Sequence, residues 1–483
     1  MPNNILIKIS IKTVVFSIFF ILYWMLISVI YSFFNFNDIS IANWIKALKI
    51  KYNLWYSLLI TLLTIIGYLV FLIHLKIKNK GNYKTKIIKN KNNIMKEFKN
   101  IDKKNIIFLN KKIGLISEKL KQHTLIVGGT GYGKTTTALT IINQLKNKLN
   151  QKIIIIDGKG DEDLINKIKS IDNNAFVWTI GYDNVYNPLA TKNNVILADK
   201  IMSLFNFSEA HYQAIAHNYL LLLIKILINK SIPITFENIV KYFPIKELKK
   251  VVDKHENEYD VLKTFIENEN DIKGLQHRLN VYLQQLNASL GNDNDLTRLI
   301  AKHNIILFSL NSFKYPELAS NVGKLIIQDL KEFATIKPQG QVINLVLDEF
   351  NVFATNAVIN LINKSRSFNY QCFLCFQTLK DLDINNKNIT DIIFGNTANI
   401  ITHKIKDPNT AEYLAKVFGT KTSEKITKQF DQESKTGKGS IREVEEYIVH
   451  PNDLKNLKTG EIYCQLLLPS SNQIIDKIIV EKD

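Results

Sequence analysis

Residues 123–145, HTLIVGGTGYGKTTTALTIINQL, combine a short apolar run, a glycine-rich turn and a helical pattern. Within this stretch Gly128, Gly133, Lys134 and Thr135 fit the spacing G-x-x-x-x-G-K-[ST] of a phosphate-binding loop. The alternative is a chance glycine-rich turn, which the apolar strand before it and the helix after it disfavour. The stretch therefore predicts a nucleotide site at the end of a buried strand, in a fold of the α/β class.

The residue types of this loop suit phosphate binding. Glycines let backbone N–H groups turn toward phosphate oxygens, and the start of the helix adds its dipole. Lys134 would neutralise the β- and γ-phosphates, and the Thr135 hydroxyl would ligate Mg²⁺. The predicted cofactors are therefore ATP and Mg²⁺. The expected nucleotide contacts are Gly128, Gly129, Thr130, Gly131, Tyr132, Gly133, Lys134, Thr135 and Thr136.

A pair of carboxylates follows an apolar run further along the chain. The run VINLVLDEF at 342–350 carries Asp348 and Glu349 where a strand would meet the nucleotide. In P-loop ATPases the first acid holds Mg²⁺ through water, and the second can orient and deprotonate the attacking water. Acidic pairs at strand ends are common on protein surfaces, but the uncharged run before this pair and the upstream loop favour catalysis.

Two further polar residues fit such a site. Gln377 ends the next expected strand, CFLCFQ, where a side-chain amide can contact both the γ-phosphate and the lytic water. Arg366 lies between the two strands and is one of only four arginines. It is a candidate arginine finger that acts on a neighbouring subunit if the protein forms a ring. A surface ion pair is the alternative for Arg366.

Short runs rich in β-branched residues alternate with helical patterns after residue 105, which predicts a parallel sheet covered by helices. Cys372 and Cys375 lie inside one such run without a second cysteine pair, so buried thiols are expected rather than a zinc or redox site. The expected strands are TLIVGG at 124–129, KIIIIDG at 152–158, AFVWTIG at 175–181, NIILFSL at 304–310, VINLVLDEF at 342–350, CFLCFQ at 372–377 and NIITHKI at 399–405.

Two segments interrupt this alternation. Between about residues 190 and 300 the apolar residues keep helical spacing, which predicts a helical domain inserted into the nucleotide-binding domain. Residues 421–446 are poor in apolar residues, which predicts an exposed, mobile loop.

Two apolar segments near the N-terminus, 13–37 and 52–75, contain no charged side chain. Each is long enough to cross a hydrocarbon core of roughly 30 Å as a helix. Trp44 and Trp55 flank the segment that joins them, where interfacial aromatic residues belong. A cleaved signal peptide and a pair of buried soluble helices are the alternatives. The length of the first run and the lack of a small-residue cleavage site disfavour the signal peptide.

Charge gives the orientation of these spans. Residues 76–104 carry eleven lysines against two acidic residues, which places both termini in the cytoplasm by the positive-inside rule. A basic stretch of this kind beside a membrane usually meets lipid head groups. The whole chain of 483 residues has a net charge of +18, which favours polyanionic partners but does not by itself identify a DNA-binding protein. Three cysteines exclude a disulfide scaffold.

From about Phe108 to Pro469 the chain resembles the coupling ATPases of type IV secretion systems, the TraG/TraD/VirD type. The order of Asp348, Arg366 and Gln377 follows the family pattern. Some members place an arginine upstream of the nucleotide loop, where this chain has Gln122 and His123, so a second basic contact to phosphate is not identified. Further matching segments are DGKGD at 157–161, NPL at 187–189, GNTANIITHKIKDPNTAEYLAKVFG at 395–419 and HPNDLKNLKTGEIYCQLLLP at 450–469.

The resemblance implies a RecA-like P-loop NTPase domain with an inserted all-α domain, preceded by two transmembrane helices, and a homo-hexameric ring. It implies a multi-pass protein of the bacterial inner membrane that passes a relaxase–DNA complex or effector proteins to subunits of the secretion channel. DNA contacts would be mainly to phosphates and little dependent on sequence. The expected parts are 1–80 (membrane anchor), 81–104 (basic linker), 105–190 and 301–483 (NTPase domain) and 191–300 (inserted helical domain).

Two other functions stay open at this point. A DNA-translocating motor of the FtsK/HerA kind shares the core, although no C-terminal winged helix of the FtsK type is evident. A membrane receptor that binds ATP and gathers effector proteins is the second. An ABC-type transporter ATPase is disfavoured because no LSGGQ-like motif precedes Asp348.

Overall fold

The computed structural model describes residues 96–481, apart from 182–183, 206, 268, 287–289, 292, 354–355, 385–386 and 432–433. These residues belong to the second of two compact units into which the chain divides, Asn93–Asp483. The expected membrane anchor, residues 1–80, and the linker up to residue 95 lie outside the described residues. Within the part that is described, no helix combines the length and the apolar character needed to span a bilayer.

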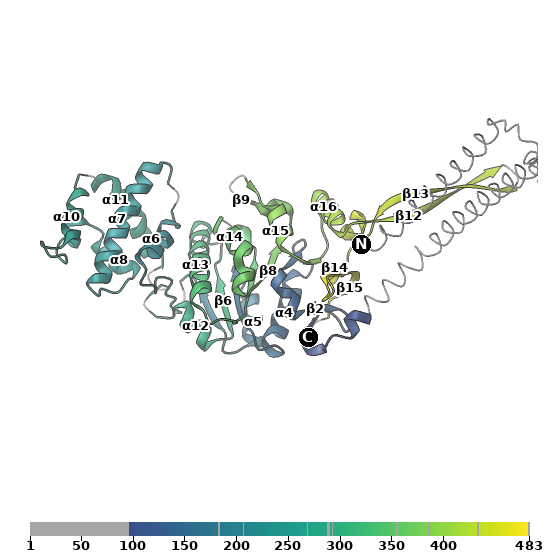
Figure 1. Cartoon of the computed structure of the whole chain (residues 1–483), viewed down its shortest axis with the longest axis horizontal. Helices are drawn as coiled ribbons and strands as arrows, with labels where there is room; N and C mark the ends of the chain where they lie inside the picture. The colour runs from purple at the N-terminus through teal and green to yellow at the C-terminus, as the bar shows by residue number, and fades with distance from the viewer. Residues whose placement is uncertain are drawn as a thin grey trace, which may run out of the picture. The chain divides into compact units, whose positions relative to one another are not determined.

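A nine-stranded mixed sheet forms the centre of this unit, in the order β15-β14-β11-β3-β8-β7-β4-β6-β5 (Figure 1). The strands from β11 to β5 run parallel, whereas β14 and β15 pair antiparallel beyond β11. The strands are β3 Thr124–Val127, β4 Lys152–Asp157, β5 Phe176–Thr179, β6 Ile305–Ser309, β7 Ile343–Asp348, β8 Tyr370–Phe376, β11 Asn399–Thr402, β14 Glu461–Leu467 and β15 Gln473–Ile479.

The predicted α/β class is confirmed, and each of the seven expected strands is present. The expectation of a wholly parallel sheet is incomplete, because β14 and β15 extend it as an antiparallel pair. A short connection between two neighbouring strands permits only antiparallel pairing, and the segment between β14 and β15 is too short for a crossover helix.

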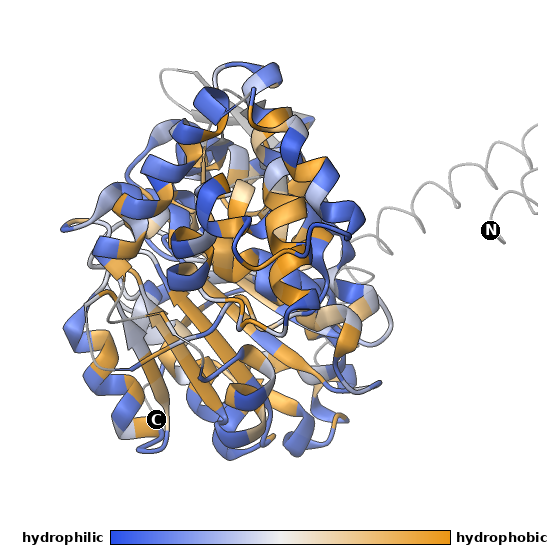
Figure 2. Ribbon diagram, turned by 90° about the vertical axis from the view of Figure 1, so that its left-hand side faces the viewer, coloured by the Kyte–Doolittle hydropathy of each residue, from blue (hydrophilic) through white to orange (hydrophobic). Residues whose placement is uncertain are grey.

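The parallel strands are apolar because both faces of the sheet are covered. Ile154 and Ile156 of β4 enter one buried core, while Ile153 and Ile155 enter the core on the opposite face. Figure 2 shows the strands as mostly hydrophobic segments, whereas the surrounding helices mix hydrophobic and hydrophilic residues. Helices α4 Lys134–Asn147 and α5 Glu162–Ile171 cover one face; α13 Pro316–Ile336 and α14 Asn356–Ser365 cover the other.

Smaller elements complete the unit. The pair β1 Ile106–Phe108 and β2 Gly114–Ile116 packs in the same core as α4 and α5. Helix α16 begins at a proline, and Asp407 caps it by accepting a hydrogen bond from the Thr410 backbone N–H at 2.8 Å. The remaining short helices here are α15 Thr390–Asn396, α16 Pro408–Phe418 and α17 Pro451–Lys455.

In the described residues, seven helices lie between β5 and β6 in the sequence, where helical spacing was predicted. Buried residues of α7 recur at Tyr219, Leu220, Leu223 and Leu227, which places one face of this helix in the core. The helices are α6 Asn194–Met202, α7 Ala210–Asn229, α8 Phe236–Tyr242, α9 Ile245–Leu248, α10 Asn257–Thr264, α11 Glu269–Leu286 and α12 Leu296–Lys302.

A buried ion network joins α6 to α13. The Lys200 ammonium, 2% exposed, donates to Asp329 Oδ1 at 2.7 Å and to the Pro188 carbonyl at 3.0 Å, and it also pairs with Glu332. The Tyr186 hydroxyl donates to the other oxygen of Asp329. Burial raises the pKa of the Asp329 carboxyl, and the Lys200 charge opposes that rise.

The prediction of a loop over residues 421–446 is wrong, because the described residues of this segment form strands. Strands β12 Thr420–Asp431 and β13 Ser434–Tyr447 form a long antiparallel pair, with Thr420 opposite Tyr447 and Lys421 opposite Glu446. A low apolar content rules out a packed core, but it does not rule out a hairpin. The backbone groups of the two strands form hydrogen bonds with each other, and this pairing requires no packed core.

Candidate nucleotide-binding site

The phosphate-binding loop occupies the turn between β3 and α4. Gly131 and Gly133 have φ angles of 81° and 106°, a left-handed conformation that favours glycine. The base of the loop is tied to the ends of two other strands. The Gly128 N–H donates to the Phe376 carbonyl at 3.2 Å, and the Gly129 N–H donates to the Lys404 carbonyl at 2.9 Å.

Lys134 begins α4 and is 9% exposed. Its ammonium donates to the Gly128 carbonyl at 2.6 Å, which holds the positive charge against the loop. Thr135 and Thr136 follow in the first turn of the helix and are partly exposed. The helix start and the ammonium together form an electropositive cradle of the kind that binds phosphate.

Gly128 is required by a close approach from the neighbouring strand. A Cβ atom at this position would lie 2.5 Å from the Cβ of His403, which directly follows β11. His403 is fully buried, and its Nε2 lies 3.0 Å from the Thr137 hydroxyl of α4. Burial lowers the pKa of His403 to about 4, so this imidazole is neutral at physiological pH. His403 therefore positions the phosphate-binding loop against β11.

Three carboxylates gather at the carboxyl ends of β4 and β7. Asp348 ends β7 and pairs in register with Asp157, which ends β4, and Glu349 follows in a left-handed conformation with φ of 51°. Burial, together with the charges of Asp157 and Glu349, raises the pKa of Asp348 to about 6, and Lys134 opposes the rise. Lys134 opposes the charge of Asp348, whereas Lys159 acts on Asp157 and Glu349 but pairs with Asp161 at 3.1 Å, so the carboxylates outnumber these two ammonium groups. This excess of negative charge fits a divalent cation held by Asp348, with the Thr135 hydroxyl as a further oxygen ligand.

Gln377 joins the phosphate-binding loop to the carboxylates. It follows β8, the strand between β3 and β7. The Thr130 hydroxyl donates to Gln377 Oε1 at 2.7 Å, and Gln377 Nε2 donates to Glu349 Oε1 at 2.9 Å. The amide orientation is thereby fixed at both ends, and the Glu349 carboxylate is aimed toward the loop.

Gln377→Ala is expected to lower kcat for ATP hydrolysis by about 10-fold, because Glu349 loses the hydrogen bond that orients it. The KM for ATP should change little, since the loop glycines and Lys134 are untouched. Steady-state kinetics would measure both values. Gln473→Ala, on the exposed surface of β15, is the matched control. Equal kcat in the two variants would exclude a positioning role for Gln377.

Arg366 lies at the opposite end of the strands, where β8 begins. It begins the short turn Arg366–Phe368 that precedes β8, whereas Gln377 follows the end of the same strand, and its side chain is exposed. Seven strand residues span roughly 20 Å. The side chain therefore cannot reach the phosphate-binding loop of its own subunit, so the suggested role on a neighbouring subunit stays a prediction.

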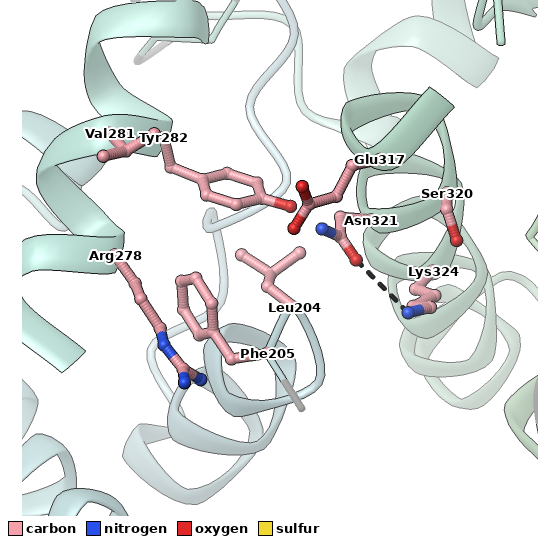
Figure 3. A pocket seen from close by; sticks show the side chains of 9 residues that line it. All are labelled: Leu204, Phe205, Arg278, Val281, Tyr282, Glu317, Ser320, Asn321 and Lys324. Atoms are coloured by element: carbon pink, nitrogen blue, oxygen red, sulfur yellow. Dashed lines mark hydrogen bonds between the residues drawn. The ribbon is translucent and has the colours of Figure 1, made fainter. Parts of the chain in front are cut away.

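An open cavity lies between α11 and α13, and Arg278 and Tyr282 are among the residues of the helical region that line it (Figure 3). The Tyr282 ring packs edge-on against Phe205, with ring centroids 5.3 Å apart, and the Arg278 guanidinium lies 5.2 Å from the centre of the Phe207 ring. Figure 3 shows the Tyr282 hydroxyl pointing toward Glu317 and Asn321. Tyr282 is thus a packing residue with a polar end.

Sequence reasoning missed several parts of this site. Asp157 lay in a quoted motif without a role, and its place beside Asp348 depends on the pairing of β4 with β7. His403 likewise lay in an expected strand, NIITHKI at 399–405, without a role. Lys404 and Lys406 place their ammonium groups 5.3 and 5.5 Å from the centre of the Tyr132 ring, which adds positive charge beside the loop. These lysines follow β11, and only the neighbouring strand order could have indicated their position.

Family models match two long parts of the chain. Residues 101–350 match the model described as "Helicase HerA, central domain", which covers more than half of the chain. The chain belongs to the HerA helicase central-domain family. Residues 342–459 match the model described as "TraM recognition site of TraD and TraG", which confirms the resemblance to coupling proteins of type IV secretion systems. Its P-loop, its carboxylates and this family membership identify this HerA-family chain as a P-loop ATPase.

Individual relatives are more distant. An uncharacterized protein of Mycoplasma pneumoniae (strain ATCC 29342 / M129 / Subtype 1) is 29% identical over 133 residues, which are 27% of this chain and 86% of that protein. The bacterial conjugative coupling protein TrwB, in an unbound form lacking 70 N-terminal residues, is 13% identical. It aligns over 80% of this chain and 91% of that one, with a TM-score of 0.59. TrwB bound to ADP and Mg²⁺ is 14% identical, covers 81% and 92%, and gives a TM-score of 0.56. At this identity the likeness to TrwB concerns the fold.

Proposed function

We propose that this ATPase couples ATP hydrolysis to the transfer of DNA, or of effector proteins, into a type IV secretion channel. The observation that carries the proposal is the match of residues 342–459 to the TraM recognition model of TraD and TraG. That segment contains Asp348, Glu349 and Gln377, so the coupling-protein resemblance and the hydrolytic residues occupy the same part of the fold. TrwB, a bacterial conjugative coupling protein, shares that fold.

In the proposed reaction, Gly128–Thr136 bind the phosphates of ATP and Lys134 compensates their charge. Glu349, oriented by Gln377, accepts the proton of the attacking water. Asp348 and Thr135 would hold Mg²⁺, which supplies positive charge to the phosphates when bound. Below about pH 6 the Asp348 carboxyl carries a proton that must leave before it can serve as a ligand, so nucleotide binding weakens with acid.

The partners and the location extend this proposal. Residues 1–80 anchor the protein in the bacterial inner membrane as a multi-pass segment, and the basic linker 81–104 meets the lipid head groups. Residues 105–190 and 301–483 form the ATPase domain, and the inserted helical domain, 191–300, faces the cargo. The cargo is a relaxase joined to single-stranded DNA, or an effector protein, and the receiving partners are the channel subunits. The family model named for TraM recognition supports such protein partners.

A homo-hexameric ring would explain the position of Arg366. In a head-to-tail ring the end of the sheet that carries Arg366 can face the phosphate-binding loop of the next subunit.

Arg366→Ala is expected to lower hydrolysis at least about 10-fold. Mixing equal amounts of inactive Arg366→Ala and Lys134→Ala subunits should restore activity at about a quarter of the interfaces. Measured hydrolysis of the mixture checks this; Arg298→Ala, an exposed arginine paired with Asp295, is the control. A mixture as inactive as its components would contradict action between subunits.

The function is tested by ATP hydrolysis of the detergent-purified full-length protein with single-stranded and double-stranded DNA across a salt series. A coupling ATPase should be stimulated by single strands, and the stimulation should fade with salt because the contacts are to phosphates. Hydrolysis that is indifferent to both forms of DNA would instead identify a receptor for protein effectors.

A second candidate function is a HerA-like motor that translocates duplex DNA, which the match over residues 101–350 favours. Such a motor should be stimulated by duplex rather than by single strands, and it should displace a third strand from a DNA triplex as it moves. The two substrates compared at one salt concentration separate this function from the first.

A further inference from the structure

The loop between β6 and α13, residues 310–315, carries the most exposed large apolar side chain in the described part of the chain. Phe313 is 97% exposed, whereas the next values are 64% for Ile336 and 63% for Ile479. Lys314 beside it is also exposed. A phenylalanine held wholly in water contributes no burial to the fold, so its ring face is available to a ligand.

The base of this loop is firmly held. Leu310 is fully buried, and its N–H donates to the Asp157 carbonyl at 2.9 Å. The Ser312 N–H donates to the Gly158 carbonyl at 3.0 Å. Asn311 accepts hydrogen bonds from the backbone N–H groups of Lys314 and Tyr315, at 3.2 and 3.0 Å. A rigid base therefore presents an exposed tip.

The same base is connected to the catalytic carboxylates. The Gly158 N–H donates to the Asp348 carbonyl at 3.1 Å. The Asp157 carboxylate accepts hydrogen bonds from the backbone N–H groups of residues 159–161, which fixes the turn. That turn touches the loop directly, because a Cβ atom on Gly160 would lie 2.3 Å from the Asn311 Cα. A shift at Asp348 would thus be transmitted to residues 310–315 through Gly158.

The tip itself is too far away to contact the nucleotide. In the sheet β8, β7 and β4 separate β6 from β3, the strand that leads into the phosphate-binding loop. At about 4.8 Å per strand the separation is about 19 Å. Because β6 and β7 both run parallel to β4, loop 310–315 nonetheless begins at the same end of the strands as Asp348.

The chemistry of the tip fits a nucleic-acid strand. An exposed aromatic ring can stack on an unpaired base of any sequence, and an adjacent lysine can pair with a phosphate. The Lys314 ammonium lies 5.1 Å from the centre of the Tyr315 ring, which supports it as a cation beside the aromatic tip. Duplex DNA offers no free base faces for stacking, so a single strand is the better ligand.

We propose that Phe313 and Lys314 bind single-stranded nucleic acid, and that the turn at Gly158–Gly160 couples this contact to Asp348. The inference rests on the proposed function as a DNA-coupled ATPase and names the contact site. Because the base of the loop is hydrogen-bonded to this turn, the loop moves together with the turn, and its position follows the state of the nucleotide site.

Binding of fluorescent oligo(dT) to the full-length protein tests the contact. Phe313→Ala should weaken binding about 10-fold, because one base loses its stacking partner, and Phe313→Trp should retain binding. Ile336→Ala, which removes an exposed apolar side chain at the far end of α13, should bind like the wild type. A Phe313→Ala protein with unchanged affinity, at an unchanged melting temperature, would overturn the proposal.

The coupling is tested by the ratio of the hydrolysis rates with and without oligo(dT). Gly160→Ala should reduce this ratio toward one while oligo(dT) still binds, because the added methyl group displaces Asn311. Gly340→Ala is the matched control. Both glycines have a positive φ angle, 84° at Gly340 and 75° at Gly160, but no atom lies within 4 Å of a Cβ added at Gly340. Equal ratios in both variants would contradict coupling through this turn.

These results separate the inference from the proposed function. A wild-type protein that binds oligo(dT) while Phe313→Ala binds equally well refutes the loop alone. A wild-type protein that does not bind oligo(dT) at all refutes the loop contact and single-stranded DNA as the cargo, and it leaves effector proteins as the cargo to test.

Discussion

Lys134→Ala is expected to reduce ATP hydrolysis by at least about 10³-fold while the protein stays folded. The ammonium is held against the phosphate-binding loop, 2.6 Å from the Gly128 carbonyl, and its charge also opposes that of the Asp348 carboxylate. Without it, the negative charge that develops on the transferred phosphoryl group is not compensated. Phosphate release from detergent-purified protein measures the loss.

Lys146→Ala is the matched control for that experiment. It removes a lysine from the last turn of the same helix, where the ammonium lies 3.8 Å from Asp172 and far from the loop. The control should hydrolyse ATP at close to the wild-type rate. Turnover retained by Lys134→Ala would overturn the assignment of the phosphate-binding loop.

Lys200→Ala is expected to cost about 3–5 kcal/mol of folding free energy, because it leaves the buried Asp329 and Glu332 carboxylates without their counter-charge. The same change breaks the hydrogen bond to the Pro188 carbonyl, which ties the segment before α6 to that helix. The melting temperature of the full-length protein should fall by about 5 °C or more. Thermal unfolding followed by circular dichroism measures it.

A surface ion pair provides the comparison. Lys225→Ala removes the partner of Glu258 at 3.0 Å, but the lysine side chain is 55% exposed, so the expected cost is below about 1 kcal/mol. Adding Asp329→Asn to Lys200→Ala should recover part of the lost stability, because it removes one of the uncompensated charges. Equal melting temperatures for Lys200→Ala and Lys225→Ala would mean that the buried network does not stabilise the fold.

The parallel strands could be predicted because burial on both faces leaves a continuous apolar run, as in KIIIIDG at 152–158. The edge strand β15 could not, because only some of its residues are buried. The β12–β13 pair also escaped prediction, since backbone pairing of polar strands produces no apolar pattern. The apolar content of a segment therefore indicates whether helices cover it on both faces, and it says little about strand pairs that no other element covers.

The site divides in the same way. Lys134, Asp348 and Glu349 could be predicted from local motifs, because the chemistry fixes their spacing relative to a strand end. Asp157 and His403 enter the site through strands that are neighbours in space and distant in sequence. No single segment contains that information. The exposure of Phe313 is likewise a property of the assembled fold, because Phe is otherwise a typical core residue.

The cysteines have a practical consequence. The chain contains three, Cys372, Cys375 and Cys464, and all of them are free and fully buried in the sheet. Burial raises the pKa of the Cys372 and Cys464 thiols to about 12, so neither offers a thiolate at neutral pH. A maleimide dye or a disulfide crosslinker should therefore react only with a sulfhydryl introduced on purpose. Phe313→Cys in the otherwise native sequence would give a single addressable position from which to follow the cargo.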